Sequence, residues 1–315
     1  MAATFLAAKL KLPDNSTALH RRISTTWLPV FALLAILNLP TAAVSAEGFP
    51  KLRDSVDPVL QQQLEDLVRG KGLNTQVDGE RLALALVDIS DLRKPRLASL
   101  NGDTMEYAAS LPKLAILLAA FVQIEAGKLE LDSRLESDLV QMIRHSSNPA
   151  ATRVLDRVGR EELLQILQSP RFKFYDKKTG GGLWVGKAYA KKGAYHRDPL
   201  HNLSHGATVF QVARFYYLLE TNRLVGPELT RKMKQILSKP AIEHKFVKGL
   251  KARPGVQLYR KSGTWKQFHA DCALVEYGQH KYIIVGLAEH PRGGQWLTDL
   301  AAPLHDLIVT KQSNK

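Results

Sequence analysis

The stretch YAASLPKLAILLAAFVQIEA, residues 107–126, is the part of the sequence that decides the fold. From Leu111 onward it is apolar on nearly every side, which predicts a buried helix that Gly127 ends. Ser110 and Lys113 lie three residues apart at its start, so the amine can reach the hydroxyl on one helical face. Taken alone, the pair could also be a capping serine and a solvated lysine, although a lysine inside so apolar a run does not suit that reading.

Two further short motifs follow along the chain. Ser146-Ser147-Asn148 precedes a stretch, 149–158, that predicts a helix, and by itself the triplet is an ordinary helix cap. Lys261-Ser262-Gly263-Thr264 ends a predicted strand. A glycine there lets a ligand approach the backbone, and a lysine with a serine can hold a carboxylate, but a plain strand end is the alternative. A literal Lys-Thr-Gly triplet at 178–180 has no strand pattern around it, and we predict a loop there.

The remaining patterns predict an α/β fold of the α+β kind. We expect helices at 52–68 and 297–309, strands at 81–89, 96–100, 257–264, 270–277 and 282–288, and mainly helices over 135–237. Because two strands alone are only marginally stable, the two sets of strands must join. The prediction is a five-stranded antiparallel sheet, built from 47–109 and 240–315 and flanked by the terminal helices, with an inserted all-helical lobe at 110–239. The irregular segment 172–205 is either a functional loop or disordered.

The first 46 residues predict a cleavable secretory signal rather than part of the globule. Basic residues precede an apolar stretch, 27–39, and small residues follow up to Ala46, after which we place the cut. The stretch is short for a membrane-spanning helix, so an uncleaved anchor is the less favoured alternative. We therefore expect residues 47–315 to act in the periplasm or outside the cell, with membrane contact only through the signal.

The net charge and the cysteine count limit the partners and the kinds of site that the protein can have. Loss of the signal removes four basic residues and Asp14, which lowers the formal charge from +14 to +11. A basic chain favours anionic partners, and export favours cell wall or carboxylate substrates over nucleic acid, which we do not expect to bind. Cys272 is the only cysteine, so an intramolecular disulfide and a cysteine-based zinc site are both excluded. We expect a monomer without a metal or cofactor.

The ordered set of motifs is more specific than any one of them. Ser-x-x-Lys on a buried helix, Ser-x-Asn in a helical lobe and Lys-Ser-Gly on a strand resemble the class A β-lactamases and penicillin-binding proteins. Residues 107–113, YAASLPK, are similar to that family's nucleophile segment, and residues 146–151, SSNPAA, to its Ser-Asp-Asn segment. The resemblance covers nearly the whole chain after the signal and implies a β-lactamase/transpeptidase-like fold.

That resemblance implies roles for the motif residues. Ser110 would become acylated by a β-lactam or an acyl-D-alanine carbonyl, and Lys113 would take its proton, for which the Lys113 pKa must fall. Ser146 would relay the proton to the leaving amine, and Asn148 would hold Lys113 and the substrate amide. The N–H groups of Ser110 and Thr264 would form the oxyanion hole, and Lys261, Ser262 and Gly263 on the strand would bind the substrate carboxylate.

One departure from the family concerns the second half of the reaction. The class A enzymes carry a Glu-x-x-Leu-Asn signature whose glutamate activates the deacylating water, but no glutamate occurs here between Glu162 and Glu220. Asp198 is a possible substitute base, with a solvated surface carboxylate as the alternative. The family's extra arginine after Lys-Thr-Gly is also absent, and Lys266 or His269 are candidates to replace it.

Three functions remain open at this point. A β-lactamase-type hydrolase clears its acyl-enzyme quickly, whereas a penicillin-binding D,D-peptidase, or a relative acting on another amide or ester, does not need to clear a β-lactam. The third reading is a non-catalytic module that binds cell-wall polymer through its basic surface. In the first two, the partner is a small-molecule β-lactam or a peptidoglycan-derived substrate.

Overall fold

The computed structural model describes residues 48–189 and 193–310, so the predicted signal and its cut after Ala46 lie outside the described residues. Within the described residues the main sheet has five strands in the order β2-β1-β10-β9-β8, all neighbours being antiparallel. Its strands are β1 (Leu82–Asp88), β2 (Arg96–Leu100), β8 (Gln257–Trp265), β9 (Phe268–Tyr277) and β10 (His280–Glu289). The predicted five-stranded antiparallel sheet is confirmed.

Strand β1 is apolar at every position but its last because both of its faces are covered. Leu82, Leu84 and Leu86 pack into one hydrophobic cluster, and the residues between them, Ala83, Ala85 and Val87, pack into another. Alternate side chains of a strand point to opposite faces of the sheet, so this division places the sheet between two layers of helices.

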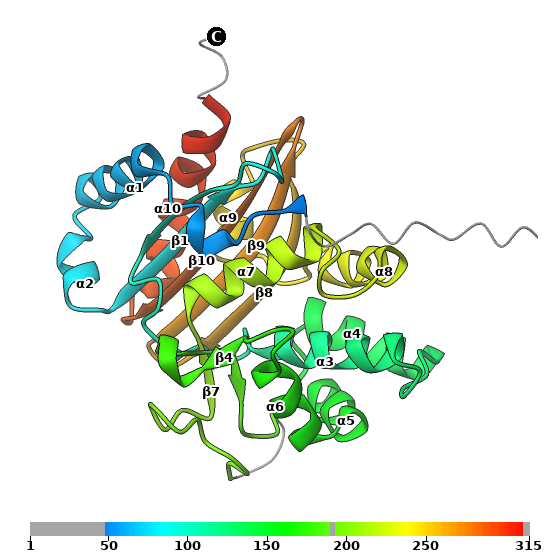
Figure 1. Cartoon of the computed structure of the whole chain (residues 1–315). Coiled ribbons are helices and arrows are strands. Elements are labelled where there is room, and N and C mark those ends of the chain that lie inside the picture. Colours follow the sequence, from blue (N-terminus) through cyan, green and yellow to red (C-terminus); the bar gives the residue numbers. More distant parts are fainter. Residues whose placement is uncertain (1–47, 190–192, 311–315) are drawn as a thin grey trace, which may run out of the picture. The chain divides into compact units, whose positions relative to one another are not determined.

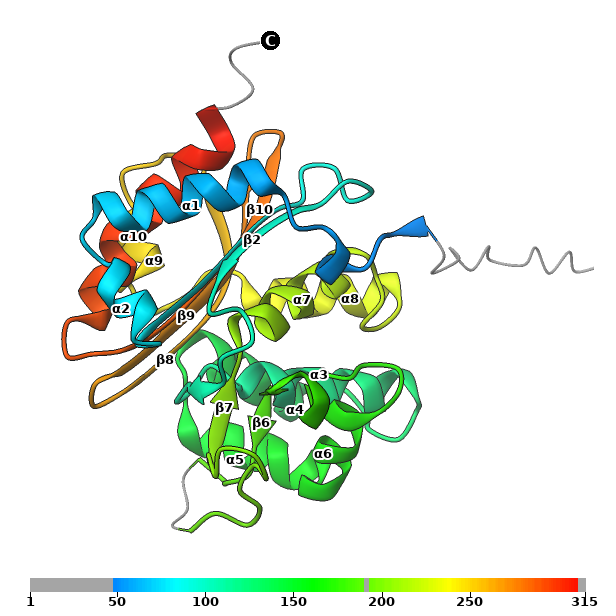
Figure 2. The same cartoon turned by 60° about the vertical axis from the view of Figure 1, so that its left-hand side comes forward.

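Helices cover the two faces in different ways (Figures 1 and 2). Helices α1 (Pro58–Gly70), α9 (Phe246–Leu250) and α10 (Gly293–Val309) lie on one face, with α2 (Asn74–Asp78) beside β1. Helix α7 (Val209–Glu220) lies on the other face, where it packs against β1, β9 and β10. The predicted flanking of the sheet by N- and C-terminal helices is therefore confirmed.

The N-terminal helix begins later than its apolar pattern predicts. The pattern places its start at Leu52, but Leu52–Asp54 form a short 3-10 helix and Val56 forms a parallel bridge with Leu97. Helix α1 starts at Pro58, where the missing N–H is harmless, and the Asp57 carboxylate accepts a hydrogen bond from the Leu60 N–H at 2.7 Å. The Asp-Pro pair thus fixes the start of the helix and overrides the periodicity.

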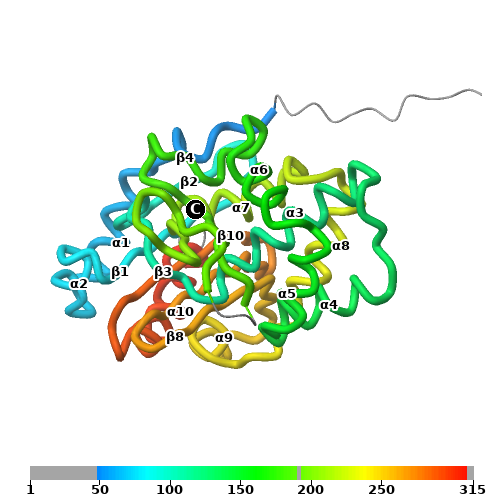
Figure 3. Tube along the Cα trace, turned by 90° about the horizontal axis from the view of Figure 1, so that it is seen from below, coloured from blue at the N-terminus to red at the C-terminus, as the bar shows by residue number. Residues whose placement is uncertain are grey.

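The remaining helices gather beyond α7, on the side of the sheet that carries β8 (Figures 1 and 3). They are α3 (Lys113–Glu125), α4 (Ser133–Arg144), α5 (Asn148–Val158), α6 (Arg160–Gln168) and α8 (Pro227–Leu237). Ten of the thirteen residues of α3 are buried, in agreement with its uninterrupted apolar sequence. Helix α7 packs on the sheet even though its residues belong to the range that we predicted as the helical lobe.

Five short strands complete the fold. Strands β3 (Glu106–Tyr107), β7 (His205–Ala207) and β6 (Trp184–Val185) form a small sheet, and β4 (Tyr175–Asp176) pairs with β5 (Gly181–Gly182). The segment 172–205 therefore has defined structure in its described part, and the Lys178-Thr179-Gly180 triplet lies in it as a turn of 3-10 helix, Lys177–Thr179, and the left-handed Gly180. Across residues 48–189 and 193–310, no helix is long and apolar enough to cross a membrane.

Candidate active site

Ser110 and Lys113 meet at the start of helix α3. The chain leaves β3, turns at Ala109, which has a positive φ of 50°, and enters α3 at Lys113 with Pro112 as the N-cap. Ser110 therefore lies in the turn before the helix, not within its first turn. The Lys113 Nζ donates to Ser110 Oγ at 3.1 Å, and the Lys113 side chain is fully buried. The alternative of a capping serine with a solvated lysine does not occur, since Lys113 is fully buried.

The second motif supplies the other acceptors of the Lys113 amine. Its Nζ donates to the Ser146 carbonyl at 2.6 Å and to Asn148 Oδ1 at 2.8 Å. Ser146 has a positive φ of 55°, and Ser147 caps helix α5 by accepting from the Ala150 N–H. The triplet is thus a helix cap as well as part of the site. Ser147 caps helix α5, and Ser146 and Asn148 on either side of it contact Lys113.

The third motif brings a second buried lysine to the same place. Lys261 Nζ donates to Ser146 Oγ at 3.0 Å and to the Ser262 carbonyl at 2.5 Å, and only 1% of Lys261 is exposed. Lys113 Nζ lies 3.4 Å from the same Ser146 hydroxyl oxygen. The hydroxyl of Ser146 therefore lies between two lysine amines.

Burial changes the protonation of both amines. Removing an ammonium group from water without a carboxylate beside it disfavours the charged form, and burial lowers the pKa of Lys113 to about 7. Burial lowers the pKa of Lys261 well below its ordinary value, and the neighbouring charges of Lys113 and Arg260 lower it further. Within the described residues, Lys113 forms no ion pair with a carboxylate. At neutral pH its amine is therefore free to accept a proton in a substantial fraction of molecules.

Gly263 brings strand β8 against the turn that holds Ser110. A Cβ atom at this position would lie 2.2 Å from the Ala108 carbonyl oxygen and 2.8 Å from the Ser110 backbone nitrogen. Only a glycine permits this approach, because both neighbours are backbone atoms that cannot move aside. The next residue, Thr264, consequently lines the same cavity as Ser110. In the described part of the chain, the Ser110 N–H donates no backbone hydrogen bond.

Of the motif residues, Ser110, Asn148 and Thr264 line a cavity of about 530 Å³. Aromatic rings form much of its wall: the ring centroids of Tyr189 and His205 lie 4.2 Å apart, and those of Tyr107 and Phe268 lie 5.2 Å apart. Its charged lining residues are Lys187 and Arg197, and no aspartate or glutamate lines it among the residues described. The full lining is Tyr107, Ala109, Ser110, Asn148, Lys187, Tyr189, Arg197, Leu203, Ser204, His205, Thr264, Trp265 and Phe268.

Asp198 does not face this cavity, so its suggested role as a substitute base is not supported by its position. It is 2% exposed, and its carboxylate accepts from the Tyr175 hydroxyl at 2.8 Å and the Leu203 N–H at 2.8 Å. The N–H groups of Leu200 and His201 also donate to it. Burial opposes its ionisation, but these hydrogen bonds together lower the pKa of Asp198 below its ordinary value. Asp198 is a structural carboxylate that holds its own loop.

The Asp198→Asn substitution should therefore affect the loop and not the chemistry. An amide cannot accept as many of these donors, and leaving a buried donor unsatisfied costs roughly 1–3 kcal/mol. We expect a lower free energy of unfolding and faster proteolysis within 172–205, while labelling of Ser110 by penicillin keeps its rate. Chemical denaturation and intact-mass kinetics measure the two effects. A selective loss of turnover with unchanged stability would show that Asp198 acts in catalysis.

Tyr189 occupies the side of the cavity next to Lys113. The Lys113 Nζ lies 4.5 Å from the centroid of the Tyr189 ring, and the Tyr189 hydroxyl donates to the Ala109 carbonyl at 3.2 Å. Burial raises the Tyr189 pKa well above its ordinary value, so the ring stays neutral. The segment 172–205 thus presents an aromatic ring, not a carboxylate, to the amine of Lys113.

Neither of the suggested replacements for the family arginine is among the residues that line the cavity, although His269 pairs with Thr264 across the β8–β9 hairpin. Lys266 is exposed in the β8–β9 turn with a φ of 51°, and His269 packs against Gly293 and Gly294. Two residues that sequence reasoning missed, His244 and Lys245, form side-chain hydrogen bonds with the third motif. His244 Nε2 lies 3.2 Å from Ser262 Oγ, and Lys245 Nζ donates to Thr264 Oγ1 at 2.8 Å. Both precede α9, in a stretch with no motif or strong periodicity.

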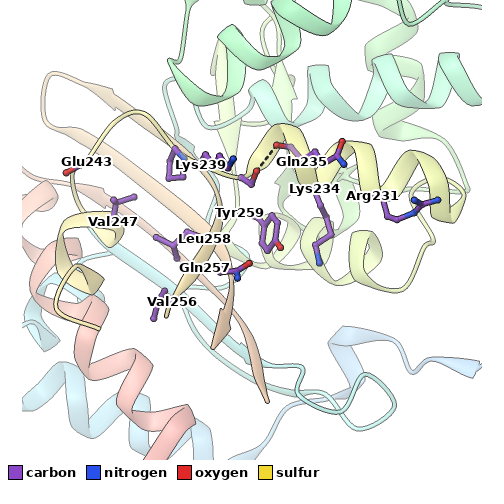
Figure 4. A pocket seen from close by; sticks show the side chains of 12 residues that line it. Arg231, Lys234, Gln235, Lys239, Glu243, Val247, Val256, Gln257, Leu258 and Tyr259 are labelled. Atoms are coloured by element: carbon purple, nitrogen blue, oxygen red, sulfur yellow. Dashed lines mark hydrogen bonds between the residues drawn. The ribbon is translucent and has the colours of Figure 1, made fainter. Parts of the chain in front are cut away.

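A larger cavity, of about 800 Å³, lies between helix α8 and the beginning of strand β8 (Figure 4). Lys234, Lys239 and Tyr259 are among its lining residues, and none of the three motifs contributes to it. Within the described residues, no group of three or more His, Cys, Asp or Glu side chains is arranged to hold a metal ion.

The five-stranded sheet, the buried helix α3 and the Ser110–Lys113 pair together define a serine hydrolase of the β-lactamase type. The model of the Beta-lactamase enzyme family matches residues 60–140 and 134–308, and the chain belongs to this family. No curated protein sequence matches the chain significantly.

Solved structures show the same fold at low sequence identity. PBP-A superimposes with a TM-score of 0.58 at 16% identity, covering 80% of this chain and 97% of that one. A β-lactamase from Sphaerobacter thermophilus superimposes with a TM-score of 0.58 at 16% identity, covering 75% of this chain and 96% of that one. A double mutant of the class A β-lactamase of the last common ancestor of Gram-negative bacteria superimposes with a TM-score of 0.62 at 17% identity. The match covers 79% of this chain and 98% of that one. The fold class and the family resemblance expected from the sequence are both confirmed.

Proposed function

We propose that Ser110 attacks the carbonyl of a β-lactam, or of a related peptidoglycan-derived amide, and becomes acylated. The observation that carries this proposal is the 3.1 Å contact of Ser110 Oγ with a buried lysine amine whose pKa is about 7. A neutral amine at this distance can take the hydroxyl proton, directly or through a water molecule, as the new C–O bond forms.

The other motif residues complete the reaction. When the C–N bond breaks, the leaving nitrogen needs a proton, and the Ser146 hydroxyl between the two amines is placed to pass one on. Asn148 holds Lys113 and is available to the substrate amide from the cavity wall. The N–H groups of Ser110 and Thr264 would stabilise the oxyanion, an arrangement that the close packing at Gly263 supports. Lys261 and Ser262 would bind the substrate carboxylate.

We further propose that the acyl-enzyme is cleared slowly, as in a penicillin-binding peptidase. Deacylation needs a base that activates water, and no aspartate or glutamate is among the described residues that line the cavity. Residues 190–192, which the structure does not describe, are Ala-Lys-Lys and add no carboxylate. A leucine-to-glutamate mutant of PBP-A, 16% identical to this chain, has been solved as an acyl-enzyme complex with penicillin G.

The setting of this activity is also a proposal. The basic and aromatic walls of the cavity suit a small anionic substrate with an apolar part. The sequence of residues 1–46, with the expected cut after Ala46, supports export to the periplasm or the cell exterior.

Mixing the protein with penicillin G and following intact mass and product release together tests this function. We expect one penicilloyl adduct per chain that persists while little product accumulates, and no adduct in Ser110→Ala. Many turnovers without a lasting adduct would favour a working β-lactamase. Absence of both adduct and product would reject the acylation proposal and favour a non-catalytic module.

Acylation should become faster as the pH rises through neutrality. Lys113 accepts a proton only when it is neutral, and a pKa of about 7 makes half of the amines neutral near that pH. The rate constant for adduct formation should therefore rise about tenfold per pH unit below pH 7 and level off above it. Stopped-flow acylation between pH 5.5 and about 9 measures this profile. A rate that is flat, or that falls with pH, would exclude Lys113 as the base.

A further inference from the structure

We propose that His244 is a positioning residue that directs the Ser262 hydroxyl toward the carboxylate of the substrate. This inference rests on the proposed function, in which Ser262 binds that carboxylate. His244 Nε2 lies 3.2 Å from Ser262 Oγ, so the ring and the hydroxyl share one hydrogen bond. A hydroxyl has a single proton, and the direction of this bond decides whether that proton is free for a ligand.

The direction of this bond depends on which nitrogen of the His244 ring carries the proton. Burial, together with the charges of Lys245, Arg260 and Lys261, lowers the pKa of His244 to about 4, and the nearby Asp271 only partly opposes this. The neutral ring has one N–H. If Nε2 carries the proton, it donates to Ser262 Oγ and leaves the serine proton to donate to a carboxylate oxygen. In the opposite tautomer Nε2 would accept the Ser262 proton. The Ser262 oxygen would then present only lone pairs to the carboxylate, which would repel it.

A buried ion pair fixes the backbone that carries His244. Arg260 and Asp271 are almost fully buried and form two hydrogen bonds of 2.7 and 2.8 Å. Arg260 also donates to the carbonyls of Ile242 and His244, at 2.9 and 3.3 Å. Asp271 in turn accepts from the Phe246 N–H at 3.1 Å. The segment 242–246 is therefore tied to strands β8 and β9 on both sides of His244.

Lys245 adds a second connection to the same strand. Its Nζ donates to the Gly263 carbonyl at 2.6 Å, to Thr264 Oγ1 at 2.8 Å and to the Ala270 carbonyl at 3.0 Å. With all three donors used, this amine fixes β8 and is not free to bind a ligand. His244 and Lys245 thus contact three consecutive residues of the third motif, and the His244 contact ends on the Ser262 hydroxyl.

Equilibrium binding without acylation tests the proposal. Ser110→Ala, and the same variant combined with His244→Phe or His244→Gln, are titrated by calorimetry with penicillin G and with its methyl ester. We expect His244→Phe to weaken binding of the acid about 10- to 100-fold, the usual effect of losing one hydrogen bond to a charged group. Binding of the ester should hardly change. His244→Gln, whose amide N–H can donate to Ser262, should restore most of the affinity for the acid.

Three other results of the titrations would contradict the proposed role of His244. Equal weakening of acid and ester would mean that His244 only supports the strand, and unchanged binding of the acid would mean that it directs nothing. The absence of any preference for acid over ester in Ser110→Ala would remove the premise. Failure of the proposed function would appear separately, as absence of a penicilloyl adduct in the unmodified protein.

Discussion

Lys113→Met should lower the rate of Ser110 acylation by about 10²- to 10⁴-fold, the usual contribution of a positioned general base. Methionine keeps the unbranched apolar stem that fills the core beside Ser110 but has no amine to take the hydroxyl proton. The contacts of Lys113 Nζ with the Ser146 carbonyl and Asn148 Oδ1 disappear as well. The second-order rate constant for penicilloyl adduct formation, followed by intact mass, measures the effect.

Lys178→Met is the matched control for this experiment. Lys178 lies in the exposed triplet that copies the Lys-Thr-Gly motif in letters only, and it does not line the cavity. The control should acylate at the unmodified rate, and circular dichroism checks that both variants are folded. Acylation of Lys113→Met within a few-fold of the unmodified rate would show that another group accepts the proton.

Gly263→Ala should damage both the fold and the reaction. The added methyl group would lie 2.2 Å from the Ala108 carbonyl oxygen and 2.9 Å from the Leu111 nitrogen, so strand β8 must move away from the turn that holds Ser110. Overpacking of this kind costs about 1–3 kcal/mol of unfolding free energy. A displacement of about 1 Å between Ser110 and Thr264 would lower acylation by about 100-fold.

Gly70→Ala provides the comparison for a harmless added methyl group. A Cβ atom at Gly70 has no neighbour within 4 Å, and the residue lies at the exposed end of α1. Denaturant unfolding and adduct kinetics on both variants separate the two effects. Gly263→Ala with the stability and rate of Gly70→Ala would show that the approach of β8 to Ser110 is not needed.

Much of the fold could be predicted because its signals are local. Strand β2 has the predicted bounds, 96–100, and the burial of α3 follows from the unbroken apolar run after Lys113. The three C-terminal strands are longer than predicted, because cross-strand pairing continues to the ends of both hairpins, at Trp265–Phe268 and Tyr277–His280. The predicted helix at 52–68 is wrong at its start, because the apolar periodicity begins before Asp57 and Pro58, and these two residues fix where the helix begins.

The site could be predicted where its contacts connect residues of the three motifs. The contacts of Ser110 with Lys113 and of Lys113 with Asn148 connect residues that the motifs had already singled out. The environment of Asp198 could not be anticipated, because its donors are backbone groups whose directions depend on the folded loop. His244 meets Ser262 across 18 residues of sequence, through a clamp at Arg260 and Asp271 that no local pattern reveals.

The buried amine of Lys113 also links the stability of the whole fold to proton uptake. Its pKa is about 7 in the folded protein and 10.5 as its ordinary value in water. Between these two values the unfolded chain binds more protons at this residue than the folded chain does, so alkalinity favours the folded state. The contribution approaches about 1.4 kcal/mol per pH unit across this window and is constant below it. The burial that keeps the Lys113 amine neutral beside Ser110 therefore lowers the free energy of unfolding at neutral pH, and this loss disappears at high pH.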